Sequence, residues 1–209
     1  ADYDVRLTVP AGWTVVGTGE LQNPDRTLAP TIRERLRQAE SSDEIVHVLT
    51  ADDFGPGRAT VGAEGELLTW HYTADRVRDV AYSLARESLW DAARTPVGDR
   101  DGDGDTDYTR VDALYRAEAT SWPDAAGYAQ HAIAFLSEYL DYPYPWSHMS
   151  VVEGENIIGG GMEYPMMTLI GAFEGMPATA LYGVIAHELG HMWFPMIVNT
   201  DEIRWAWME

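Results

Sequence analysis

Two histidines and a glutamate lie close together near the end of the chain, in the run His187-Glu188-Leu189-Gly190-His191. If this run is helical, residues four apart share one face, so both imidazoles can direct a ring nitrogen at a single Zn²⁺ ion. Glu188 can then reach a metal-bound water without binding the metal, as a general base must. The spacing therefore predicts a zinc site formed by His187 and His191, with Glu188 as the catalytic base of a hydrolase.

The residues around this pattern predict a buried helix. Most neighbours between Gly183 and Phe194 are apolar, and Pro177 is suited to open a helix that continues to about Ile197. Buried polar side chains need partners, and a metal ion provides one for the histidines. The plainer alternative is an ordinary helix that carries two histidines with a glutamate between them by chance.

The segment His187–Trp193, followed by Trp205-Ala206-Trp207-Met208, resembles the gluzincin zinc aminopeptidases, the family of alanyl aminopeptidase and leukotriene hydrolase. The resemblance implies a third zinc ligand, a glutamate, at position 210, one past the last residue. Glu209 precedes that position and is not assigned as the ligand. We therefore expect a chain that stops just before its third ligand, lacks the family's transition-state tyrosine and helical domain, and is inactive as a peptidase by itself.

A second motif, Gly160-Gly161-Met162-Glu163-Tyr164, resembles the family's Gly-x-Met-Glu-Asn motif, with tyrosine in the last position. The resemblance implies that Glu163 pairs with the free α-amine of the substrate and that Gly160, Gly161 and Met162 belong to the substrate-binding site. A carboxylate at the end of a cleft pairs with an ammonium group and so restricts cleavage to the terminal bond. If the family resemblance is set aside, the same residues are typical of a glycine turn followed by a strand.

An acidic loop between residues 99 and 107 fits the first half of a calcium-binding loop. Its acids occupy positions 1, 3, 5 and 9 of such a loop, and a glycine stands at position 6. Position 12, normally a bidentate glutamate, is Arg110. The loop is therefore either a structural calcium site or a solvated acidic tip. The candidate calcium ligands are Asp99, Asp101, Asp103, Asp105 and Asp107.

Composition limits the classes of partner. The chain has 209 residues, a net charge of -20, and no lysine, so all 14 basic residues are arginine. Such a negative field disfavours nucleic acid and anionic lipid as partners. Adaptation to high salt explains the acid excess, whereas a GC-rich genome explains only the missing lysine. The absence of cysteine excludes disulfides, thiolate metal sites and a cysteine nucleophile.

Periodicity predicts an α+β fold in two parts. The pattern of the first third is that of a β-rich domain, and a mixed α+β part follows from about residue 76. The family resemblance implies that residues 1–75 are the end of an N-terminal β-rich domain, and that residues 76–209 are the first half of a thermolysin-like catalytic domain with a buried His-Glu-x-x-His helix. Strands are predicted at 3–9, 13–16, 44–50, 66–72, 111–119, 149–152 and 162–170. Helices are predicted at 30–40, 124–140 and 177–197, and residues 77–89 are expected to be extended, with a helix as the alternative.

Three functions fit the sequence. The first is a zinc aminopeptidase acting on peptides with a free N-terminus, together with the remaining part of the same protein. The second is a thermolysin-like endopeptidase, against which the motif around Glu163 argues, and the third is a non-catalytic binding domain derived from a peptidase. No apolar run approaches the ~20 residues that a membrane span needs, and no signal peptide is visible. A periplasmic or secreted location and a cytoplasmic one both fit.

Overall fold

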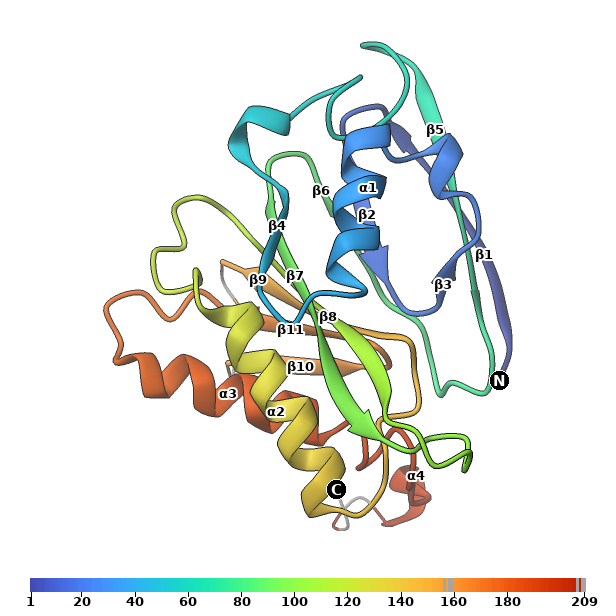
Figure 1. Cartoon of the computed structure of the whole chain (residues 1–209), viewed down its shortest axis with the longest axis vertical. Coiled ribbons are helices and arrows are strands. Elements are labelled where there is room, and N and C mark those ends of the chain that lie inside the picture. The colour runs from blue at the N-terminus through green and yellow to red at the C-terminus, as the bar shows by residue number, and fades with distance from the viewer. Residues whose placement is uncertain (156, 158–159, 206, 208–209) are drawn as a thin grey trace.

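The centre of the fold is a six-stranded sheet with the strand order β10-β11-β9-β8-β7-β4 (Figure 1). β9 pairs in parallel with β8 and with β11, and the other neighbours are antiparallel. The computed structural model describes residues 1–155, 157, 160–205 and 207. The strands are β4 (Val46–Leu49), β7 (Leu89–Gly98), β8 (Asp107–Tyr115), β9 (His148–Gly154), β10 (Gly161–Tyr164) and β11 (Met167–Gly171).

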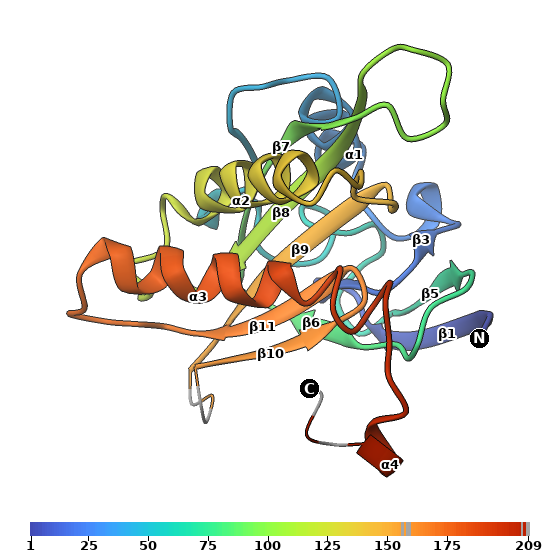
Figure 2. The ribbon, with the colours of Figure 1, turned by 90° about the horizontal axis from the view of Figure 1, so that it is seen from below.

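Both faces of this sheet are buried. Along β8, Val111 and Ala113 belong to one apolar core, whereas Leu114 belongs to another, as the alternation of a strand requires. The first core lies under helices α2 (Ala125–Tyr139) and α3 (Ala178–Gly190), which run over the same face of the sheet (Figure 2). The second core lies under helix α1 (Pro30–Ala39) and the N-terminal strands. A short helix, α4 (Glu202–Trp205), follows α3.

The N-terminal strands form two small sheets. One has the order β1-β5-β3, and the other pairs β2 with β6. Trp70 and Tyr72 of β5 are buried in the second core, and the Tyr72 hydroxyl donates to the Val15 carbonyl at 2.6 Å. These strands therefore cover the face of the large sheet opposite α3. Their bounds are β1 (Tyr3–Pro10), β2 (Thr14–Gly17), β3 (Glu20–Leu21), β5 (Leu67–Ala74) and β6 (Tyr82–Ala85).

The two predicted domains exchange strands. β4, from the first 75 residues, pairs with β7 at the edge of the large sheet, and β6, from the later part, pairs with β2. The second core includes Val16 and Ile32 from the first segment and Met167 from the second. The predicted domain boundary at residue 75 stays a prediction, and residues from both sides of it share the second core.

Most predicted elements near the N-terminus and in the middle of the chain are confirmed. The alternating residues 3–9 form β1, and the predicted helices at 30–40 and 124–140 are α1 and α2. Residues 77–89 contain no helix; β6 within them pairs with β2, and β7 of the large sheet begins at Leu89. The prediction of a single strand at residues 162–170 is wrong. These residues form a hairpin of β10 and β11 instead, because the chain turns at Pro165 and Met166, and Met166 has a φ of 65°.

The prediction for the last helix is wrong in two respects. α3 ends at Gly190 and not near Ile197, since Pro195 lacks the N–H that a continuing helix would donate. It is also not buried all round, because α2 and the β10–β11 hairpin pack on one side only. On that side Leu181, Ile185, Glu188 and Leu189 are buried, while His187 is exposed. Among the described residues, no helix has both the length and the apolar character needed to cross a bilayer.

One buried carboxylate lies at the centre of the second face. Asp112 of β8 is fully buried, and its two oxygens accept from Arg110 Nε at 3.0 and 3.1 Å. Trp90 Nε1 donates to the same carboxylate at 2.9 Å. A buried charge is tolerated only when it is paired and hydrogen-bonded, so this network holds β7 and β8 in register on that face.

We predict that Asp112→Ala lowers the free energy of unfolding by about 3–5 kcal/mol, because it leaves the Arg110 charge and the Trp90 N–H without their main partner. Denaturant unfolding followed by circular dichroism measures this change. Asp25→Ala, at an exposed site, is the matched control and should change stability by less than about 0.5 kcal/mol. Equal effects of the two substitutions would contradict the role given to Asp112.

Candidate metal centre and active site

Helix α3 brings the two predicted zinc ligands together. His187 lies in its last turn, and His191 follows as the C-cap residue with φ -61° and ψ -17°, which continues the helical path. The Nε2 atoms of the two rings are 3.2 Å apart, and the ring planes cross at 87°. The spacing of four residues thus places two ring nitrogens at one point in space.

The backbone after the helix orients the second imidazole. His191 Nδ1 lies 2.9 Å from the Phe194 carbonyl oxygen. The neutral tautomer that donates Nδ1–H to this carbonyl keeps a lone pair on Nε2, the atom that faces His187. Metal-binding histidines commonly have such a partner on the nitrogen that does not bind the metal. The turn that ends α3 therefore contributes to the site as well as the helix.

The geometry of the pair fits a zinc ion. Two nitrogens bound to zinc at 2.0–2.1 Å with tetrahedral angles lie about 3.3 Å from each other, close to the observed 3.2 Å. Ligand atoms of His187, Glu188 and His191 all lie within 4.8 Å of one another. The described residues thus supply two imidazoles and an adjacent carboxylate. The position expected for a further ligand and Glu209 both lie outside the described residues.

Glu188 is a buried carboxylate with an unused oxygen. Its relative exposure is 5%, and within the described part of the chain Oε2 has no hydrogen-bond partner. Burial raises the pKa of the Glu188 carboxyl, and the nearby charge of Glu163 acts in the same direction, while the two histidines oppose it. An unpaired buried oxygen is costly, so this atom is placed for a partner such as a water or a substrate group.

The backbone of β10 allows Glu188 to sit where it does. A Cβ added to Gly161 would overlap Oε1, Cδ and Cγ of Glu188. The carboxylate therefore lies directly against bare main chain, and only glycine leaves room for it. The sequence suggested Gly161 as a substrate-binding residue, and the structure gives it this packing role, which spacing alone could not show.

The hairpin β10–β11 places Glu163 beside the same carboxylate. Glu163 is half-buried, pairs across the hairpin with Thr168, and raises the pKa of Glu188 through its charge. Gly161 and Glu163 share one face of β10, so the Met162 side chain points to the other face, where it is 42% exposed. The Met162 carbonyl accepts from the buried Thr168 hydroxyl at 3.0 Å. Gly160, with φ 101°, opens the strand.

The acidic loop is a closed turn between β7 and β8, far along the chain from α3. Asp99, Asp101 and Asp107 offer oxygens within 4.8 Å of one another, whereas Asp103 and Asp105 do not join this group. Asp99 accepts from the backbone N–H groups of residues 102 and 104 at 2.6 and 3.0 Å. These bonds satisfy the carboxylate without an ion, so calcium binding at the loop stays a prediction from the sequence.

A calcium titration tests that prediction. If the loop binds calcium, adding the ion should raise Tm, because a ligand that binds only the folded state stabilises it. Asp101→Asn should remove most of this rise, while Asp141→Asn, at an exposed site in another loop, should not. A Tm that is unchanged by calcium would identify the loop as a solvated tip.

The fold is similar to part of a metallopeptidase. One solved structure with this likeness is an M1 zinc metallopeptidase from Deinococcus radiodurans, with a TM-score of 0.52 and 17% sequence identity over 95% of this chain. The chain spans 35% of the length of that structure. No protein-family model matches the chain, and no curated protein matches it. The likeness therefore supports a fold of the metallopeptidase kind.

We predict that Gly161→Ala displaces the Glu188 side chain and destabilises the protein by about 1–3 kcal/mol, the usual cost of overpacking. In a Glu188→Ala background the overlap is gone, so the same substitution should cost much less. Gly183→Ala, on α3 with nothing within 4 Å, is the control and should stabilise by about 0.5–1 kcal/mol. If Gly161→Ala lowers stability equally with Glu188 present and with Glu188→Ala, the packing of Glu188 against Gly161 is contradicted.

Proposed function

We propose that the protein is a zinc-dependent aminopeptidase that hydrolyses the N-terminal peptide bond of peptides. The observation that carries the proposal is the pair of Nε2 atoms 3.2 Å apart on His187 and His191, with the buried carboxylate of Glu188 beside them. The fold, which is similar to part of a metallopeptidase, supports the same class of reaction. Because the chain spans 35% of that structure, the activity of the whole protein is part of the proposal.

The proposed roles follow from the positions of the side chains. His187 and His191 would hold the zinc ion, which would supply a Lewis acid that makes a water more acidic. Glu188 would act as the general base that accepts a proton from the attacking water, and its Oε2, without a partner among the described residues, is the oxygen available for this role. A catalytic zinc takes three protein ligands, so the proposal includes a further carboxylate, which the family resemblance expects at position 210.

Glu163 is proposed to select the free amino terminus. Its half-buried carboxylate lies on the strand that packs on α3, near enough to Glu188 for the two charges to interact. An ammonium group paired with Glu163 offsets one of these two negative charges and fixes the first residue of the peptide relative to Glu188. A thermolysin-like endopeptidase does not bind a free α-amine and so does not need the Glu163 carboxylate. A non-catalytic domain does not need a general base such as Glu188.

We predict that Glu188→Gln retains zinc and lowers kcat by a factor of about 10²–10⁴, because the amide fills the same space but cannot accept a proton. Metal content after dialysis and the rate on an aminoacyl-anilide substrate, both measured on the whole protein, are the two measurements. Glu138→Gln, at an exposed site of α2, should change neither. Appreciable turnover by Glu188→Gln would remove the base from the proposal, and loss of zinc would make Glu188 a ligand instead.

We predict that Glu163→Gln raises KM for a free-amine substrate about tenfold or more, because a charge-assisted hydrogen bond is lost. An N-acetylated peptide of the same sequence has no ammonium group and should be affected far less. The change in KM caused by Glu163→Gln is therefore compared between the free-amine substrate and the N-acetylated peptide. An equal loss on both would leave Glu163 with a structural role, and better cleavage of the blocked peptide by the unmodified protein would favour an endopeptidase.

A further inference from the structure

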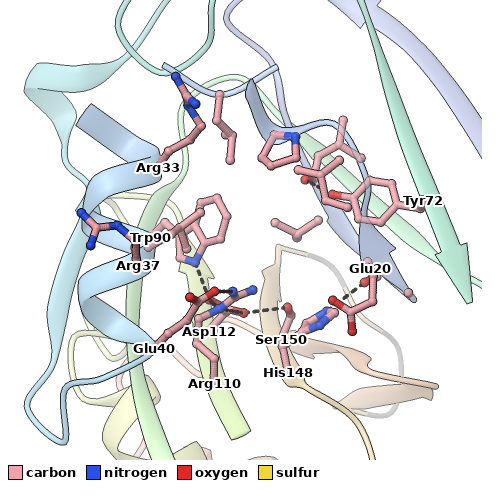
Figure 3. Close-up of a pocket in the computed structure, with 18 residues that line it drawn as sticks. Glu20, Arg33, Arg37, Glu40, Tyr72, Trp90, Arg110, Asp112, His148 and Ser150 are labelled. Atoms are coloured by element: carbon pink, nitrogen blue, oxygen red, sulfur yellow. Dashed lines mark hydrogen bonds and ion pairs between the residues drawn. The ribbon is translucent and has the colours of Figure 1, made fainter. Parts of the chain in front are cut away.

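A cavity of about 280 Å³ lies on the face of the large sheet opposite α3. Its floor includes Asp112 and Ser150, which alternate along their strands with Val111 and Val151 of the core under α3. α1 and the N-terminal strands form the other walls (Figure 3). The thickness of the sheet therefore separates this cavity from the candidate metal centre, and the two are different sites.

One end of the cavity is apolar. Its volume is at the small end of the range for ligand pockets, which suits a molecule the size of a single amino acid. The apolar lining residues are Val15, Val16, Leu21, Leu28, Leu36 and Trp90.

The other end of the cavity contains Arg110, whose guanidinium has N–H groups that are not hydrogen-bonded within the described part of the chain. Arg110 Nε is bound to Asp112, and Nη1 donates to Glu40 at 3.2 Å. Nη2 makes no hydrogen bond to a described residue, and it is not a fully buried atom, since 19% of the Arg110 side chain is exposed. Arginine N–H groups bind carboxylates strongly in such places. This end of the cavity can therefore accept one carboxylate group.

The same end also attracts a positive charge. Glu20 lies across the cavity floor from Arg110 and Glu40 (Figure 3). Arg110 offsets the charge of Asp112, which leaves the two glutamates in excess, and Arg33 and Arg37 point away from this floor (Figure 3). Burial lowers the pKa of His148, which lies between the two sides and is 3.1 Å from the Gly17 carbonyl, so it adds no positive charge near neutral pH. An ammonium group is favoured beside Glu20.

We propose that this cavity binds a small zwitterion with an apolar body, the class to which free α-amino acids with apolar side chains belong. The ligand carboxylate accepts from Nη2 of Arg110, the ammonium group pairs with Glu20, and the side chain fills the apolar end. The inference is independent of the proposed catalytic function, although an aminopeptidase releases ligands of this class.

The test is calorimetric titration of the protein with L-leucine. Binding of leucine is expected, with 3-methylbutylamine and 4-methylpentanoate at least tenfold weaker, because each lacks one of the two charged groups. Equal binding of either analogue would overturn the zwitterionic assignment. Absence of binding up to about 10 mM leucine, where even weak complexes form, would overturn the site.

Substitutions of residues that line the cavity test whether leucine binds there. Glu20→Gln should weaken leucine at least tenfold, and Leu36→Trp, which fills the apolar end, should abolish binding. Glu34→Gln, an exposed change on the same helix outside the cavity, should have no effect. Circular dichroism checks that each variant is folded. Glu20→Gln tests the ammonium partner and Leu36→Trp tests the apolar end, so either variant alone can contradict the site.

Glu163→Gln separates this site from the candidate active site, since both are expected to bind an ammonium group. Leucine binding that survives this substitution supports the cavity. Binding that is lost in Glu163→Gln and kept in Glu20→Gln would place the ligand at the catalytic site and overturn the inference. The proposed peptidase activity can fail without affecting this outcome.

Discussion

The central strands of the large sheet are buried on both faces, and this constraint governs the rest of the structure. In the middle of β8 and β9, the side chains on the face under α2 and α3 are apolar, as this burial requires: Val111, Ala113, Met149 and Val151. On the other face, Asp112 is tolerated because Arg110 and Trp90 satisfy its oxygens. The sheet thus gives α3 a rigid support on one side and leaves a polar cavity on the other. The two proposed sites, one on each face, therefore depend on the same strands.

The candidate active site depends on a close approach between helix and sheet. Glu188 can be buried beside the two imidazoles only because β10 presents a glycine at position 161. The turn of the same hairpin is held from the N-terminal layer, where the Thr18 hydroxyl donates to the Pro165 carbonyl at 2.7 Å. Thr18 belongs to the segment between Gly17 and Glu20 that also lines the cavity. Gly19 N–H also donates to Met166 Sδ at 3.3 Å, so two hydrogen bonds join the hairpin that carries Glu163 to the cavity wall.

Local patterns in the sequence predicted the local parts of this structure. The alternation in β1, the proline at the start of α1 and the four-residue spacing of His187 and His191 each depend on neighbours in the chain, and each predicted the element found. Pairings between distant segments could not be predicted in this way. Nothing in β4 indicates that it joins β7, and nothing near Gly161 indicates that Glu188 will lie against it. Those facts follow from three-dimensional packing, which single-sequence periodicity does not encode.

The order of the elements along the chain has a consequence for biosynthesis. All six strands of the large sheet end before residue 172, whereas α3 begins at Ala178. Protein chains are made from the N-terminus and fold progressively as they leave the ribosome. The strands of the sheet therefore leave the ribosome before α3, and their slow parallel pairings can begin while α3 has not yet emerged. α3, which carries His187 and Glu188, is then the last of these elements to reach the sheet.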